Sequence, residues 1–197
     1  MTTATAALQR TLVPSTSRAA DVAAVVAGAA LIAASAQVAI PLPFTPVPIT
    51  GQTFAVLLVG AALGTVRGGS SALLYVLAGA LGAPVYAEGS AGLAVVTGPT
   101  GGYLVAFPLA ASLVGRLAEL RWDRSFSSGL GAMLCGNVLV YLVGLPWLAV
   151  SLGTGLERTL ELGLYPFVPG DIVKLFLAAG LLPTAWRVVG SRRRRAP

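Results

Sequence analysis

Long apolar runs dominate this chain, and the first of them extends from Val22 to Ile40 without a single charge. Such a run is too long for the hydrophobic region of a signal peptide, which has about 7 to 15 residues, and it suits a helix that crosses a bilayer. Charged residues make up only 10% of the chain and hydrophobic residues 56%, whereas a soluble domain is about one quarter charged. The sequence therefore predicts an all-α integral membrane protein.

The apolar runs predict six transmembrane helices in one compact bundle, which occupies residues 20–190 between an N-terminal tail (1–19) and a basic tail (191–197). The second and third runs are near or below the usual span of about 17 to 25 residues, so these helices begin inside the loops or the bilayer is thin there. The predicted spans are 22–40, 49–66, 69–84, 101–118, 130–152 and 171–189.

The arginines predict that both termini lie in the cytoplasm. With this topology eleven arginines lie on the cytoplasmic side or at its interface, and only Arg158 lies outside. The arginine run at 192–195 then fixes the topology and contacts anionic lipid, and it does not indicate nucleic-acid binding. Three unusual segments share the outer side: residues 41–50, the glycine-rich connection 82–100, and the start of the last span.

Residues 41–50 hold four prolines and no charge. Proline removes a backbone donor and constrains the residue before it, so this segment cannot continue a helix and forms a stiff, extended loop. A simple connector would be served by flexible polar residues. We therefore expect a lid over the bundle.

Asp171 and Lys174 open the last apolar run, and Lys174 is the only lysine in the chain. Charges near a membrane helix are costly, and at spacing i, i+3 these two share one helix face. Together they offer an acceptor-only group and a three-donor group, which predicts the floor of a binding site for a small polar ligand. Asn137, the only asparagine, bonds a neighbouring helix or faces this cavity; both remain open.

Several function classes are excluded or weakened. The chain has no histidine and one cysteine, Cys135, which excludes a disulfide within the chain, a Cys/His metal site and histidine-based catalysis. We expect no metal and no cofactor. The only lysine does not lie in a G-x-x-x-x-G-K-[ST] motif, so the chain has no site of this kind for ATP. A membrane enzyme that uses Asp171 and Lys174 as acid and base remains an alternative.

Small residues on the first span form two candidate faces for close helix packing, Ala29 with Ala33 and Ala30 with Ala34. In an alanine-rich helix such pairs arise easily. Packing within the bundle and docking of a partner helix therefore remain equally open.

Four motifs in order resemble the BioY family, the biotin-specific S component of energy-coupling-factor (ECF) transporters. They are residues 41–50 followed by Gly51-Gln52-Thr53, then 98–103, then 137–147, and then Pro169-Gly170-Asp171 with Lys174. The resemblance extends from about Ala27 to Lys174. It implies a six-helix protein of a prokaryotic plasma membrane, without enzyme activity, that binds biotin at its outer side. It also implies partners, a transmembrane coupling protein and two ATP-hydrolysing subunits, with Ala29 and Ala33 as the docking face.

The chemistry of biotin fits the residues that this resemblance points to. Asp171 can accept the ureido N–H groups, and Lys174 can donate to the ureido carbonyl or to the carboxylate of the tail. Backbone N–H groups or Thr100 suit the carboxylate better than Glu88 does. Asn137 offers both a donor and an acceptor, and the expected aromatic walls are Phe44, Tyr86, Tyr103 and Trp147. An S component for another small vitamin, or a solitary transporter without ATPase partners, remains an alternative.

Overall fold

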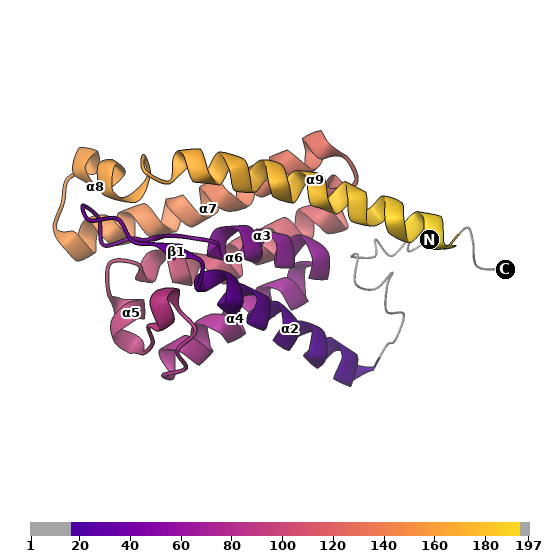
Figure 1. Cartoon of the computed structure of the whole chain (residues 1–197), viewed down its shortest axis with the longest axis horizontal. Helices are drawn as coiled ribbons and strands as arrows, with labels where there is room; N and C mark the ends of the chain where they lie inside the picture. Colours follow the sequence, from indigo (N-terminus) through magenta and orange to yellow (C-terminus); the bar gives the residue numbers. More distant parts are fainter. Residues whose placement is uncertain (1–16, 194–197) are drawn as a thin grey trace.

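A computed structural model describes residues 17–193 of the chain, with side chains as far as residue 184. Most of the two predicted tails therefore lies outside the described residues. The described part is a helical bundle (Figure 1). Its long helices are α2 (Arg18–Ala36), α3 (Gln52–Leu63), α4 (Thr65–Ala80), α6 (Gly101–Glu119), α7 (Phe126–Leu152) and α9 (Val168–Arg193). Its short elements are β1 (Ala39–Ile40), β2 (Ile49–Thr50), η1 (Ala87–Gly89), α5 (Leu93–Thr97), η2 (Trp122–Arg124) and α8 (Leu156–Gly163).

The mainly helical fold is confirmed, whereas the six-span count stays a prediction. Three of the described helices, α2, α6 and α7, are long and apolar enough to cross a membrane, and a fourth span results if α8 and α9, bent by 53°, count as one. Helix α3 has 12 residues and α4 has 16, so each falls short of a full span.

Several predicted boundaries differ from the observed helices. The first helix ends at Ala36, because the chain turns and pairs Ala39–Ile40 with Ile49–Thr50 in a short antiparallel ladder. The proline-rich segment is thus the loop of a hairpin. Helix α4 begins at Thr65 instead of residue 69, so Arg67 lies in its first turn and forms an ion pair with Asp21 of α2. The connection between the last two predicted spans, residues 153–170, contains helix α8.

Helix α6 lies at the centre and contacts α3, α4 and α7. Glycines allow the backbones of α3, α4 and α6 to touch where α3 is connected to α4, beside the C-terminal part of α6. A Cβ atom on Gly115 of α6 would lie 2.5 Å from the carbonyl carbon of Gly64, and one on Gly68 would lie 2.7 Å from the Cα atom of Gly60. A Cβ atom on Gly60 would collide with the carbonyl oxygen of Ala111. The bundle therefore depends on small residues at this junction.

Replacing Gly60 with alanine is expected to destabilise the protein, because backbone atoms cannot move aside as a flexible side chain can. Overpacking of this kind costs about 1–3 kcal/mol, which corresponds to a fall in melting temperature of roughly 2–4 °C per kcal/mol in a domain of this size. Thermal unfolding in detergent measures the effect. Gly180→Ala is the matched control, since a Cβ atom on Gly180 meets nothing within 4 Å. Equal melting temperatures for both variants would contradict this description of the junction.

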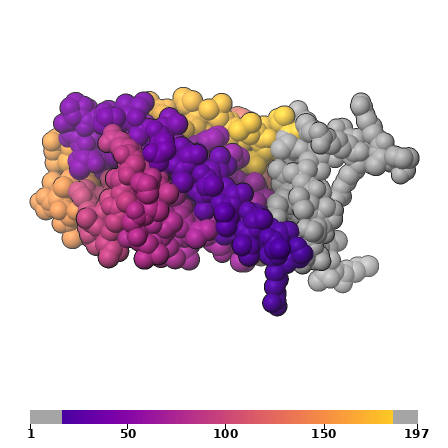
Figure 2. All heavy atoms as spheres, turned by 60° about the horizontal axis from the view of Figure 1, so that its bottom comes forward, coloured from indigo at the N-terminus to yellow at the C-terminus, as the bar shows by residue number. Residues whose placement is uncertain are grey.

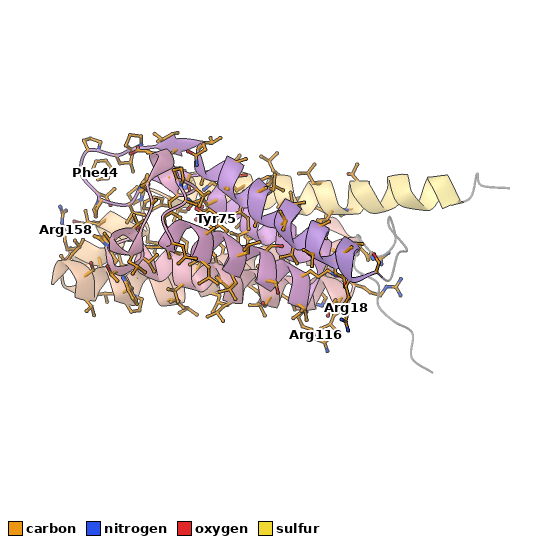
Figure 3. The ribbon with its side chains drawn as sticks, turned by 90° about the horizontal axis from the view of Figure 1, so that it is seen from below. Arg18, Phe44, Tyr75, Arg116 and Arg158 are labelled. Atoms are coloured by element: carbon orange, nitrogen blue, oxygen red, sulfur yellow. The ribbon has the colours of Figure 1, made fainter. Side chains whose placement is uncertain are left out.

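The two ends of the bundle differ in composition. Arg18 and Arg116 lie at one end, and Phe44 of the proline loop and Arg158 lie at the other (Figure 3). The proline loop, the segment around α5, and α8 gather at that second end (Figures 1 and 2). The three segments that the sequence places on the outer side, namely 41–50, 82–100 and the start of the last span, also line one common cavity and are therefore neighbours in space.

Candidate ligand-binding site

A cavity of about 240 Å³ lies between the proline loop and the ends of the long helices. Its size suits a small molecule. The loop contributes Pro46, Val47, Pro48 and Thr50, α3 contributes Gln52 and Thr53, and the segment before α6 contributes Tyr86, Ala87, Glu88, Ser90, Val95 and Thr100. The remaining lining residues are Tyr103, Leu104 and Phe107 of α6, Val140 and Tyr141 of α7, and Phe167, Asp171 and Lys174 in and just before α9.

A network of hydrogen bonds centred on Asp171 forms the polar wall of this cavity. One carboxylate oxygen, Oδ1, accepts from Lys174 Nζ at 3.1 Å. The other, Oδ2, accepts from Asn137 Nδ2 at 3.1 Å and from the hydroxyl of Tyr141. Lys174 Nζ also donates to Thr53 Oγ1 at 3.2 Å. The network thus joins α3, α7 and α9.

Burial makes this network sensitive to its composition. The Asp171 side chain is 7% exposed and that of Lys174 is 19% exposed. Asp171 lies in the first turn of α9, where the helix dipole favours a negative charge. A buried ion pair is strongly destabilised when one partner is removed, since the other charge is left without compensation. The Asp171 carboxylate and the Lys174 ammonium therefore compensate each other's charge at the cavity wall.

Aromatic rings form the apolar walls. The Tyr103 ring packs edge-to-face on Tyr141, with the ring centres 6.3 Å apart, and its hydroxyl donates to the Gly163 carbonyl at 3.0 Å. A Cβ atom on Gly144 would lie 2.6 Å from the Tyr103 ring, so glycine at this position makes room for the tyrosine. Because the Tyr103 hydroxyl already donates to Gly163, the part of Tyr103 that a ligand can contact is its ring.

Tyr86 forms a second fixed aromatic wall. Its ring packs on Gly79 and, edge-to-face, on Tyr75. Its hydroxyl donates to the Val76 carbonyl at 2.5 Å. Burial raises the pKa of the Tyr86 phenol, so this residue presents a neutral ring to the cavity at physiological pH.

No metal site is evident among the described residues, because no three His, Cys, Asp or Glu side chains gather there closely enough to hold an ion. The geometry instead suits a neutral polar head that exchanges hydrogen bonds with Asp171 and Lys174, attached to an apolar body.

The sequence model of the BioY family matches residues 5–191. The chain belongs to the BioY family. A probable biotin transporter BioY from Pyrococcus horikoshii is 40% identical over 146 residues, which cover 74% of this chain and 83% of that protein. The biotin transporter BioY of Thermotoga maritima is 39% identical over 150 residues, covering 76% of this chain and 86% of that protein.

A solved structure of the same kind shares the fold. It is the crystal structure of the S-component for biotin from an ECF-type ABC transporter, with a TM-score of 0.79 and 28% sequence identity. The match covers 88% of this chain and 95% of that one.

The structure of this BioY chain brings most of the predicted site residues together. Asp171, Lys174, Tyr86, Thr100 and Tyr103 line the cavity. Asn137 does not line it but donates to Asp171, so of the two roles left open by the sequence it takes the bond to a neighbouring helix. Its contribution to the site is to orient the carboxylate.

Two predicted aromatic walls lie elsewhere. Phe44 is 55% exposed at the tip of the loop, since the chain turns there and directs the following residues, Pro46 to Pro48, onto the cavity. Trp147 packs on Gly102 and donates from Nε1 to the Gly98 carbonyl at 2.9 Å, outside the cavity. It supports the turn that precedes α6.

Other lining residues were not predicted as site residues. Gln52 and Thr53 belong to the motif that follows the proline loop, and Gln52 Nε2 donates to the Tyr75 hydroxyl at 2.8 Å. Tyr141 lies one helical turn after Asn137, a spacing that places both on one face of α7. That spacing was the available signal for Tyr141. No signal in the sequence identified Phe107, because a phenylalanine in an apolar span is usually interpreted as facing lipid or packing in the core.

The two alanines predicted as the docking face, Ala29 and Ala33, lie on the side of α2 that packs against the bundle. Ala29 is only 8% exposed and Ala33 packs against the core, whereas Ala30 and Ala34 are exposed. A Cβ atom on the neighbouring Gly28 would lie within 3.0 Å of Val59, which confirms that this side of α2 faces the bundle. Ala29 is therefore not available to a partner.

Proposed function

We propose that this protein binds biotin in the cavity beneath the proline loop and mediates its uptake across the plasma membrane as the S component of an ECF-type transporter. The observation that carries this proposal is the Asp171 network inside a ligand-sized cavity, in a chain of the BioY family whose relatives are named biotin transporters.

The ureido head of biotin matches the polar wall. It has two N–H donors and one carbonyl acceptor. A carboxylate has about four lone-pair positions, of which Asp171 uses three in the structure, so it can still accept from an N–H group. Lys174 has three protons and two acceptors, Asp171 and Thr53, so it can donate the third to the ureido carbonyl.

The apolar part of biotin then lies against the rings of Tyr103, Phe107 and Tyr86 and beneath Val47. For the carboxylate of the tail, the hydroxyl of Thr100 is the proposed partner. Glu88 also lines this part of the cavity and would repel a carboxylate placed beside it. The tail is therefore expected to approach Thr100 and avoid Glu88.

The proposed topology has six spans, with both termini in the cytoplasm. Arg18 and Arg116 at one end of the bundle (Figure 3), together with Arg121 and Arg124 in the connection after α6, support this orientation through the positive-inside rule. The short helices α3 and α4 then form spans together with the loops at their ends. The cavity opens at the outer end, and transport is energised by a coupling protein and ATPase subunits.

The function is tested by purifying the protein alone in detergent with biotin and measuring the bound ligand after size exclusion. We expect biotin to elute with the protein at close to one molecule per chain. Elution without biotin, from protein that remains monodisperse, would overturn the proposal.

A further inference from the structure

Thr45, at the tip of the proline loop, ties the loop to helix α8. Its hydroxyl donates to the carbonyl oxygen of Leu162 at 2.7 Å and accepts from the N–H group of Val47 at 3.2 Å. Thr45 is half-buried and lies outside the cavity. One side chain thus bonds the loop to itself and to an element 117 residues away.

The sequence explains why Leu162 has a carbonyl to spare. In a continuing helix that carbonyl would accept from the N–H group four residues later, but residue 166 is a proline and has none. The next carbonyl, of Gly163, accepts from the hydroxyl of Tyr103 at 3.0 Å. Two adjacent carbonyls at the end of α8 therefore hold the proline loop and a cavity wall.

The residues that follow Thr45 are the ones that cover the cavity. Pro46, Val47 and Pro48 line it, and Val47 is 7% exposed. The base of the hairpin is fixed by the pairing of Ala39 with Thr50 and Ile40 with Ile49. Prolines leave the segment between few backbone donors, so its position depends on side-chain bonds and packing.

We propose that Thr45 is a positioning residue for ligand binding, which holds residues 46–48 over the cavity by pinning the loop to the end of α8. It does not touch the ligand. The inference rests on the proposed function, since its main consequence is a slower release of biotin. Without the pin, the loop pivots on its fixed base and the cavity opens more often.

The test compares two substitutions at Thr45. Thr45→Val keeps the shape but removes the hydroxyl, and Thr45→Ser keeps the hydroxyl. We expect Thr45→Val to release labelled biotin about 2- to 12-fold faster than wild type, the contribution of one net hydrogen bond, and Thr45→Ser to release it at the wild-type rate. Thr184→Val, which removes an exposed hydroxyl bonded within α9, is the control and should change nothing.

Limited proteolysis of the proline loop in ligand-free protein gives a second reading, because cleavage needs the loop to leave α8. Residues 41–50 should be cleaved faster in Thr45→Val and at the wild-type rate in Thr45→Ser, while the amide of Gly51, bonded to the Val38 carbonyl at the base, stays protected from hydrogen exchange in both variants. Wild-type release from Thr45→Val, or equal acceleration in both variants, would overturn the inference. A wild-type protein that fails to bind biotin would overturn the proposed function instead, and proteolysis of the ligand-free loop would still show whether Thr45 holds it.

Discussion

Asp171→Asn is expected to weaken biotin binding by about 1.5–3 kcal/mol or more, which is roughly 10- to 150-fold. The asparagine keeps one acceptor oxygen and introduces an NH₂ group, yet the groups around it, Asn137, Tyr141 and Lys174, all donate. One of these donors is left unpaired, and the ureido N–H groups lose a charged acceptor.

Titration of labelled biotin onto purified protein measures this loss. Glu161→Gln is the matched control, because it removes an exposed carboxylate that is paired with Arg158 at the same end of the bundle. It should bind as wild type does. Wild-type affinity in a monodisperse Asp171→Asn protein would contradict the assignment of Asp171.

Lys174→Met is expected to cause a loss of similar size, because it removes the donor to the ureido carbonyl and leaves the Asp171 charge unpaired. The structure supports this role, since Lys174 bonds Asp171 and Thr53 inside the cavity. Normal binding by this variant would show that the ammonium group of Lys174 does not contribute to biotin binding.

Tryptophan at Ala30 or Ala34 is expected to abolish ATP-dependent uptake and co-purification with a coupling protein, while biotin affinity of the isolated protein is unchanged. Close packing is the main attraction between helices in lipid, and a bulky ring on this exposed face of α2 separates the partners. Binding survives because neither alanine lines the cavity.

Two controls make this result specific to the docking face. Leu134→Trp, on an exposed position of α7, should leave both uptake and binding intact. Ala29→Trp should destabilise the isolated protein, since this side chain is buried. Full uptake by Ala30→Trp and Ala34→Trp would show that partners dock elsewhere.

Site residues were easiest to predict from the sequence where a polar residue stands in an otherwise apolar helix. Asp171 and Lys174 stand out in an apolar helix, and their spacing fixes a shared face, so their meeting in the cavity was predictable. The sequence could not predict which face of α2 packs against the bundle. Alanines occur all around this helix, and no stripe of polar residues distinguishes one face from another. Ala29 and Ala30 have the same side chain, and they differ only in the residues that pack against them.

The other features that the sequence did not predict lie in the segments that connect the long helices. Phe44 and Val47 are both apolar residues of one proline-rich segment, and only the turn at the tip, fixed by Thr45, decides that Val47 faces inward. Helix α8 was not among the predicted helices, because its eight residues include three charges and it lies between two predicted spans. A bond between residues 117 positions apart leaves no local pattern in the sequence.

The cavity beneath the proline loop should select biotin, and competition between related small molecules measures this selectivity directly. Labelled biotin is bound to the purified full-length protein and competed with unlabelled biotin, dethiobiotin, lipoate, thiamine and riboflavin. We expect biotin to compete best, dethiobiotin, which keeps the ureido group, to compete more weakly, and the other three compounds not to compete at equal concentration. If thiamine, riboflavin or lipoate displaced labelled biotin as effectively as unlabelled biotin does, the cavity would not be selective for biotin.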